Sequence, residues 1–154
     1  MHNRLSKFLL VSLLCAASAM AADPFLGSWK LNLTKSKFDG ETAPASLVVT
    51  WAGSAPTLTI SGEGKSADGR AIRYQYDPIY DGKEYPPKGP WNWDRVSNKQ
   101  VDANTREDTY RKGGHVIRVE RRTVSSDGRT LTYVIRVEAS HGAQTSIMVF
   151  DRVN

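Results

Sequence analysis

The chain has 154 residues and carries 21 Lys and Arg against 16 Asp and Glu, a formal net charge of +5 at pH 7. This length predicts a single domain that is large enough to bury a core. The charge excess is mild, so the composition does not place the chain among proteins that bind nucleic acid or an anionic membrane surface.

The N-terminus is predicted to be a signal peptide that is cleaved on export. Arg4 and Lys7 make a basic start, and the apolar run 8–20 is too short to span a bilayer comfortably. The tripeptide Ala19-Met20-Ala21 then matches the small-x-small pattern of a cleavage site. The alternative interpretation is a retained membrane anchor. Cleavage predicts a periplasmic or extracellular protein with no stable membrane anchor.

Two segments are therefore expected: a signal peptide over 1–21 and one mature domain over 22–154. Removal of the first segment leaves 19 basic against 16 acidic residues, a net charge of +3. The single cysteine, Cys15, leaves with it. The mature chain then has no disulfide, no thiol nucleophile and no cysteine metal site, so its stability must come from its core and its backbone hydrogen bonds.

Short runs of alternating apolar and polar residues recur along the mature chain, separated by Asp-Gly and other Gly-rich breaks. This pattern is typical of half-buried β-strands, and no window shows a convincing helical period. Eight or nine short strands joined by short connections predict an all-β fold, an antiparallel up-and-down β-barrel, with a sandwich as the alternative. Strands are expected over 27–33, 46–51, 57–62, 71–77, 92–97, 105–111, 115–124, 130–138 and 145–152, with an edge piece near 83–85.

Two hairpins share one turn chemistry. Residues 66–70 and 125–129 both have the sequence Ser-x-Asp-Gly-Arg, and each leads into an alternating strand. Directly opposed residues on antiparallel strands share a face, so the loop length decides which side chains turn inward. Three-residue loops ending in a glycine bulge are expected in both hairpins. In the first hairpin this register sets Ile60 opposite Tyr76.

The second hairpin offers a choice between two registers. A three-residue loop sets Tyr133 opposite Arg121 and gives a mostly apolar inner face. A two-residue turn at Asp127-Gly128 sets Tyr133 opposite Arg122 instead, and that face mixes apolar with charged side chains. Because burial fixes register, the first arrangement is predicted, and Arg121 is expected to point inward.

An inward arginine in a barrel needs a partner for its charge. One interpretation is that Arg121 holds a ligand carboxylate or phosphate. The other is that it reaches water near the barrel mouth or pairs with an internal acid. Together with the inward tyrosines of the neighbouring strands, it completes the predicted ligand-binding set of Arg121, Tyr133, Tyr74 and Tyr76.

Residues 77–93 differ from the rest because they hold four of the seven prolines together with Tyr80, Tyr85, Trp91 and Trp93. Proline bars this segment from a central strand. It is expected to be either a lid or portal loop with aromatic contacts to a ligand, or a stiff connection that packs its rings on the barrel wall.

The two ends of the mature chain carry a family resemblance. Asp23-Pro24 is a capping pair that predicts one short 3₁₀ turn, and Gly27-x-Trp29 follows it at the start of a strand. This arrangement resembles the first motif of the lipocalin-like (calycin) superfamily, and the run 27–38 is similar to a bacterial group of exported lipocalin-like proteins. The resemblance implies that Arg152 of the last strand packs across Trp29 and closes the barrel base.

Catalytic and metal sites are not predicted. His115 and His141 are the only mature histidines, and neither has the spacing of a metal ligand set. Asp94, Glu107 and Asp108 include candidates for an inward carboxylate, but a solvated strand face accounts for them more simply. No catalytic residue, metal or cofactor is assigned from the sequence.

The functional hypothesis is an exported binding protein for a small, partly hydrophobic or amphipathic molecule held in the barrel lumen, anionic if Arg121 contacts it. Neither nucleic acid nor a membrane is expected as a partner. Two alternatives stay open. One is a filled barrel that serves as a protein-interaction or structural module of the cell envelope, and the other is a barrel enzyme of isomerase or cyclase type.

Overall fold

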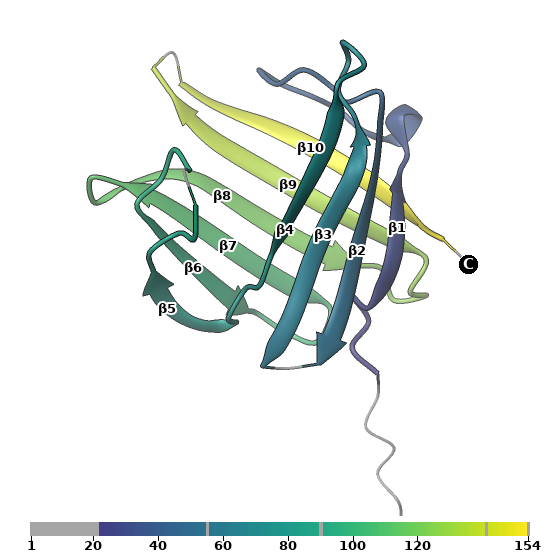
Figure 1. Cartoon of the computed structure of the whole chain (residues 1–154), viewed down its shortest axis with the longest axis horizontal. Helices are drawn as coiled ribbons and strands as arrows, with labels where there is room; N and C mark the ends of the chain where they lie inside the picture. The colour runs from purple at the N-terminus through teal and green to yellow at the C-terminus, as the bar shows by residue number, and fades with distance from the viewer. Residues whose placement is uncertain (1–21, 55, 90, 141, 154) are drawn as a thin grey trace, which may run out of the picture.

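The structure is a computed structural model, and it describes residues 22–54, 56–89, 91–140 and 142–153. The predicted signal peptide (1–21) and His141 lie outside the described residues. Ten strands and one short 3₁₀-helix make up the fold (Figure 1): β1 Gly27–Leu31, η1 Leu33–Lys35, β2 Ser46–Ser54, β3 Thr57–Lys65, β4 Ala71–Tyr76, β5 Asp81–Tyr85, β6 Arg95–Gln100, β7 Thr105–Lys112, β8 His115–Val124, β9 Thr130–Ala139 and β10 Gly142–Val153.

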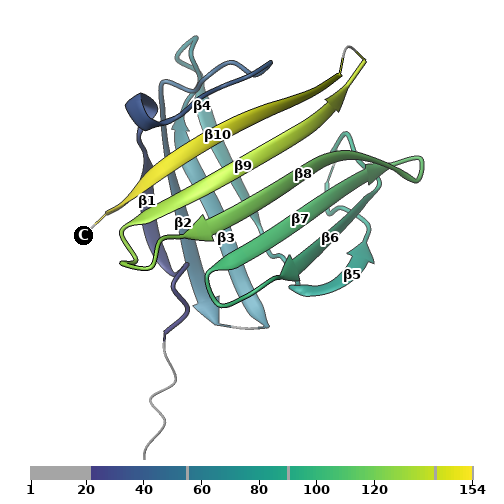
Figure 2. The same cartoon turned by 180° about the vertical axis from the view of Figure 1, so that it is seen from behind.

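The strands form one antiparallel sheet in the order β4-β3-β2-β1-β10-β9-β8-β7-β6-β5. Strands that follow each other in the chain are neighbours, except that β4 and β5 lie at the two ends of the sheet, and β1 pairs with β10. The two views in Figures 1 and 2 show the sheet curling so that β2–β4 face β7–β9 across the interior. The all-β, antiparallel up-and-down prediction is confirmed. No helix among the described residues is long and apolar enough to cross a membrane.

The strand count is ten rather than eight or nine, because the edge piece expected near 83–85 is a full strand, β5. The sheet ends at β4 on one side and at β5 on the other. Within the described residues no ladder joins these two strands, so the barrel keeps one open seam. Residues 77–80 connect β4 to β5, so this part of the proline-rich segment links the two edges of the seam, and β5 itself belongs to the segment.

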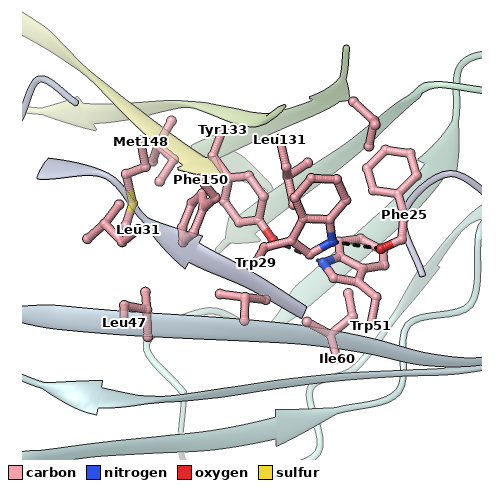
Figure 3. Packing of buried hydrophobic residues seen from close by; sticks show 13 residues of the cluster. Phe25, Trp29, Leu31, Leu47, Trp51, Ile60, Leu131, Tyr133, Met148 and Phe150 are labelled. Atoms are coloured by element: carbon pink, nitrogen blue, oxygen red, sulfur yellow. Dashed lines mark hydrogen bonds between the residues drawn. The ribbon is translucent and has the colours of Figure 1, made fainter. Parts of the chain in front are cut away.

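The apolar core gathers toward one end of the barrel, where the first and last strands meet. Along β2 the side chains of Leu47, Val49 and Trp51 are buried and alternate with more exposed neighbours, as a sheet with one inner face requires. Figure 3 shows Trp29 and Phe25 packed together beside Trp51 in this cluster. The alternation read from the sequence therefore places the core correctly in this part of the fold.

The register prediction holds for one hairpin and fails for the other. Ile60 pairs with Tyr76 across β3 and β4, as expected. Across β8 and β9, however, Tyr133 pairs with Arg122 and not with Arg121. The inward position is therefore occupied by Arg122, which is buried, while Arg121 is exposed on the outer face. The expected orientation of Arg121 is wrong.

The two turns differ in one hydrogen bond. Both begin alike, since the Gly128 N–H donates to the Ser125 carbonyl at 2.8 Å and the matching bond in the first turn is 2.9 Å. In the first turn the Ser66 N–H donates to the Arg70 carbonyl at 2.9 Å, whereas in the second the Ser125 N–H donates one residue further along, to Thr130 at 2.8 Å, and the Arg129 carbonyl accepts from the Arg152 N–H at 2.9 Å. The loop gains one residue, and the strand that follows shifts to the other register.

Candidate ligand-binding site

The two residues that the family resemblance pairs lie together where the N-terminal turn, the β8–β9 loop and the last strand meet, at the end of the barrel that we call the base. Trp29 and Arg152 are direct cross-strand partners, and the Arg152 guanidinium carbon lies 4.0 Å from the centroid of the Trp29 ring. Arg152 also donates to three backbone carbonyls, those of Gly128 at 2.6 Å, Leu26 at 2.7 Å and Pro24 at 2.7 Å. Its hydrogen bonds therefore tie the N-terminal turn and the β8–β9 loop to the last strand.

The N-terminal turn lies under this pair. The Leu26 N–H donates to the Asp23 carbonyl at 3.1 Å, the i to i+3 bond of a 3₁₀ turn, and the Asp23 carboxylate accepts from the Phe25 N–H at 3.0 Å. The Trp29 Nε1–H then donates to the Phe25 carbonyl at 2.8 Å (Figure 3). The sequence Asp-Pro-Phe thus fixes the chain entry beneath the first strand.

A second buried arginine, Arg106 on β7, lies just inside the base. Its guanidinium carbon is 4.4 Å from the ring centroid of Phe25, 4.7 Å from that of Tyr80 and 5.2 Å from that of Trp51, and it forms an ion pair with Asp23. Aromatic faces attract a guanidinium, and this attraction is stronger when water is excluded. Arg106 therefore fills the bottom of the lumen, and sequence analysis did not single it out.

Above this layer the barrel holds a cavity of about 950 Å³. Its apolar wall includes Leu47, Ile72, Ile135, Met148 and Phe150, which come from strands on both sides of the lumen. Such a volume lies within the range of natural small-molecule pockets, roughly 300–1,000 Å³. The upper lumen is thus open to a guest, in contrast to the filled base.

The proline-rich segment forms part of the cavity wall. Tyr85, Trp91 and Trp93 all line the cavity. The two tryptophan rings stack with centroids 4.9 Å apart, and Trp93 meets Tyr110 edge to face at 4.8 Å. Trp91 stays 46% exposed, so this aromatic group reaches from the cavity interior to the surface. The segment therefore packs on the barrel and borders the cavity at once.

The three predicted tyrosines, Tyr74, Tyr76 and Tyr133, also lie on the cavity wall. Tyr74 lies opposite Gly62 on the neighbouring strand, where a Cβ would collide with its ring, so a larger residue there would displace the ring. Burial raises the pKa of Tyr74 to about 12 and raises those of Tyr76 and Tyr133 as well. All three hydroxyls are therefore neutral near pH 7. The Trp51 Nε1–H donates to the Tyr133 hydroxyl at 3.3 Å (Figure 3).

The polar part of the cavity is an ion-pair cluster centred on Arg122, which is 2% exposed. Its two terminal nitrogens donate to the carboxylates of Asp108 and Glu120, and one of them also donates to the Tyr76 hydroxyl at 3.2 Å. Glu120 in turn accepts from Arg118 Nε at 2.6 Å. A buried arginine with this many acceptors is held in one place and one charge state.

The arrangement follows from the pairing of β7 with β8. Arg106 lies directly opposite Arg122, and Asp108 lies directly opposite Glu120. Like charges that face each other across a strand pair repel, so the favourable contacts run either diagonally, as between Arg122 and Asp108, or along one strand, as between Arg122 and Glu120. Burial raises the pKa of Asp108, and the adjacent Arg122 opposes that shift.

The cluster extends to the surface through Arg118, whose Nη1 donates to Glu41 at 3.1 Å. Glu120, Arg118 and Arg122 line the cavity, whereas Asp108 is fully buried beneath Arg122 and is not part of the wall. The described residues of this cluster thus hold two guanidinium groups and three carboxylates.

The remaining candidates lie outside the lumen. Arg121 forms an ion pair with Glu107 at 3.2 Å on the outer face, and it does not line the cavity. Asp94 and His115 are exposed. Across 22–54, 56–89, 91–140 and 142–153, no three His, Cys, Asp or Glu side chains gather in the manner of a metal site.

Comparison with known proteins gives likeness in structure alone. No family model matches the chain, and no curated protein matches it in sequence. Among solved structures, it is similar to a point mutant of the fluorescent protein UnaG, with a TM-score of 0.62 and 12% identity over 85% of this chain and 97% of that one. A Schistosoma mansoni fatty acid binding protein in complex with arachidonic acid gives 0.56 and 16% over 85% and 97%. Zebrafish ileal bile acid-binding protein complexed with cholic acid gives 0.53 and 11% over 84% and 99%.

This chain has a lipocalin-like fold, an antiparallel up-and-down sheet of ten strands that curls on itself. Each of these structures is covered almost end to end, so the likeness includes the curled sheet as a whole rather than one hairpin. Identities of 11–16% show the fold and leave the ligand to be argued from the side chains.

Proposed function

We propose that the protein binds a small, partly hydrophobic molecule non-covalently in its barrel. The observation that carries this proposal is the cavity of about 950 Å³, whose wall is largely apolar and aromatic with a few fixed polar groups at one side. Burial of an apolar ligand body supplies affinity, and a few polar contacts supply orientation. Two proteins of the same fold, described as complexes with arachidonic acid and cholic acid, support a ligand of this general class.

The two alternatives receive less support. A barrel that acts only as an interaction or structural module would be filled to native density, whereas this lumen is filled only near the base. An isomerase or cyclase would need a titratable group that can exchange a proton with the substrate. Asp108 does not line the cavity, and Glu120, which does, is held in ion pairs with Arg118 and Arg122.

The first test is native mass spectrometry of the mature protein purified from its own host. We expect a stoichiometric small molecule that is lost when the protein is denatured. Ile135→Trp, which fills the cavity from its wall, should remove the adduct, and Val134→Trp on the outer face of the same strand is the matched control. A bare mass in several preparations, or an adduct that survives Ile135→Trp, would contradict the proposal.

We propose further that the protein works outside the cytoplasm, in the periplasm or beyond it. The basic start, the short apolar run and the Ala19-Met20-Ala21 pattern support cleavage before Ala22. N-terminal sequencing of the protein from its host should then begin at Ala22. A chain that retains Met1 would overturn the export proposal and leave the binding proposal intact.

A further inference from the structure

We infer that the polar group of the ligand is a hydrogen-bond donor, a hydroxyl or an ammonium, and not a carboxylate. This inference rests on the proposed function, because it concerns the guest of the same cavity. It starts from the partners that the arginines of the lumen already have.

The buried arginine of the cavity is already neutralised within the protein. Both terminal nitrogens of Arg122 donate to carboxylates, one to Asp108 and the other to Glu120. A ligand carboxylate that paired with Arg122 would have to displace one of these acids. Displacement would leave Asp108 as an unpaired buried charge, which is strongly unfavourable, or would deprive Glu120 of one of its two cations.

Arg118, the other arginine of the cluster, is in the same position, whereas Arg73 and Lys88, the remaining cations of the cavity wall, are exposed to solvent. Arg118 pairs with Glu120 through Nε and with Glu41 through Nη1. The cluster as a whole therefore has three carboxyl groups against two guanidinium groups, a charge of −1 when all are ionised. An incoming anion would add to this excess, whereas an ammonium group would balance it and a hydroxyl group could donate to a carboxylate.

The aromatic part of the cavity wall favours the same class of ligand head group, a cation or a neutral hydrogen-bond donor. The rings of Tyr74, Tyr76 and Trp93 line the cavity. Faces of such rings attract cations and repel anions through their quadrupole. Because the tyrosine hydroxyls are neutral, they can accept a hydrogen bond from the ligand without adding charge. Glu120 lines the cavity and offers the guest a carboxylate acceptor beside the buried arginine.

The test uses three probes that share one alkyl chain and differ in the head group: decan-1-ol, decylamine and decanoate. Binding is measured at pH 7 by calorimetry, with quenching of tryptophan fluorescence as a second readout. We expect decan-1-ol and decylamine to bind at least about tenfold more tightly than decanoate, a difference of about 1.4 kcal/mol. Decanoate as the tightest probe, or equal binding of all three, would overturn the inference and leave the proposed function standing.

Failure of all three probes to bind would instead overturn the proposed function, and the inference would fall with it. A matched pair of variants sharpens the main comparison. Glu120→Gln removes one carboxylate and frees part of Arg122, so decanoate affinity should rise by about tenfold and decylamine affinity should fall. Glu107→Gln on the outer face, where the carboxylate pairs with Arg121, should change neither.

A third variant guards against a folding defect in Glu120→Gln. Glu41 lies at the surface and contacts only the outer end of the cluster, through Arg118. Glu41→Gln should therefore shift the three affinities in the same direction by a smaller factor. Decanoate affinity that stays unchanged in a folded Glu120→Gln or Glu41→Gln protein would count against the inference.

Discussion

The base and the cavity of this barrel both hold an arginine against aromatic rings, yet the two arginines donate to different kinds of acceptor. Arg152 at the base stacks on Trp29 and donates to backbone carbonyls, which cannot move away. Arg122 in the cavity donates to the side chains of Asp108 and Glu120. The comparison teaches that a buried arginine in a barrel points to an anionic ligand only if its own chain has not already supplied the acceptors.

The largest loss of stability should come from a substitution in the base. Trp29→Ala removes a fully buried ring and the platform of Arg152, and large-to-small changes of this kind cost about 3–5 kcal/mol. Chemical denaturation should show that loss in the free energy of unfolding. Trp91→Ala at the cavity mouth, where the ring is 46% exposed, is the control and should cost less than about 1 kcal/mol. Equal losses would contradict the division into a structural base and an open cavity.

The next effect should come from the ion-pair cluster. Arg122→Met leaves Asp108 and Glu120 buried without their shared cation, and breaking a buried pair from one side costs about 3 kcal/mol. Arg121→Met on the outer face, a one-residue shift along the same strand, should cost less than about 1 kcal/mol. If the two variants were equally stable, the structural register would be wrong and the cluster would not hold the fold together.

The stability of Arg122→Met should also depend on pH in a defined direction. Burial raises the pKa of Asp108, and loss of the arginine removes the charge that opposes this shift. A carboxyl group with a raised pKa in the folded state binds its proton more tightly when folded, so acidification stabilises the fold. The stability gap between the variant and the parent protein should therefore narrow from pH 7 to pH 5 in denaturation curves. A gap that widens would contradict the assignment.

A smaller loss of stability should distinguish an arginine that stacks and donates from a side chain that contributes only its positive charge. Arg152→Lys keeps the charge but loses the planar fork that reaches three carbonyls and stacks on Trp29. We expect a loss of about 1–2 kcal/mol by thermal or chemical unfolding. Arg121→Lys is the control and should change stability by less than about 0.5 kcal/mol. If Arg152→Lys left the free energy of unfolding unchanged, the positive charge alone would account for the contribution of Arg152 to the base.

The smallest change in stability should come with a clear change in binding. Gly62→Ala places a Cβ against the Tyr74 ring, which must then move into the cavity. We expect a cost of about 1 kcal/mol for this overpacking and weaker binding of whatever ligand the parent protein takes. Gly69→Ala in the exposed β3–β4 turn, where a Cβ meets nothing, tests backbone strain without affecting the cavity. Unchanged binding in Gly62→Ala would remove Tyr74 from the proposed site.

The sequence predicts the parts of this fold that depend on local patterns. Alternation along the chain located the sheet, and the resemblance at the two termini joined Trp29 to Arg152, which the structure brings together. The β3–β4 register was also predictable, because Ile60 and Tyr76 belong to a face that burial selects. In each case the residues that decide the structure are close in sequence or form a known pair.

The β8–β9 register was not predictable from the same turn chemistry. Its longer loop includes a hydrogen bond from another strand, in which the Arg152 N–H donates to the Arg129 carbonyl, and no local pattern announces that contact. The rule that apolar residues face one another also failed, because the inner face of β8 is charged: Glu120 and Arg122 alternate there with exposed neighbours. A signal was present in the alternation of Arg106 and Asp108 on β7, which offers opposite charges to that face.

The open seam between β4 and β5 leaves two strand edges with free backbone donors and acceptors, and such edges can pair with another molecule. The protein counters this hazard on the β5 side. That strand has only five residues, its pairing with β6 slips between Asp81 and Glu84, and Pro86 and Pro87 follow it at once. Charged side chains, an irregular register and proline each obstruct the addition of a further strand. The segment that borders the cavity therefore also protects the molecule from edge-to-edge aggregation.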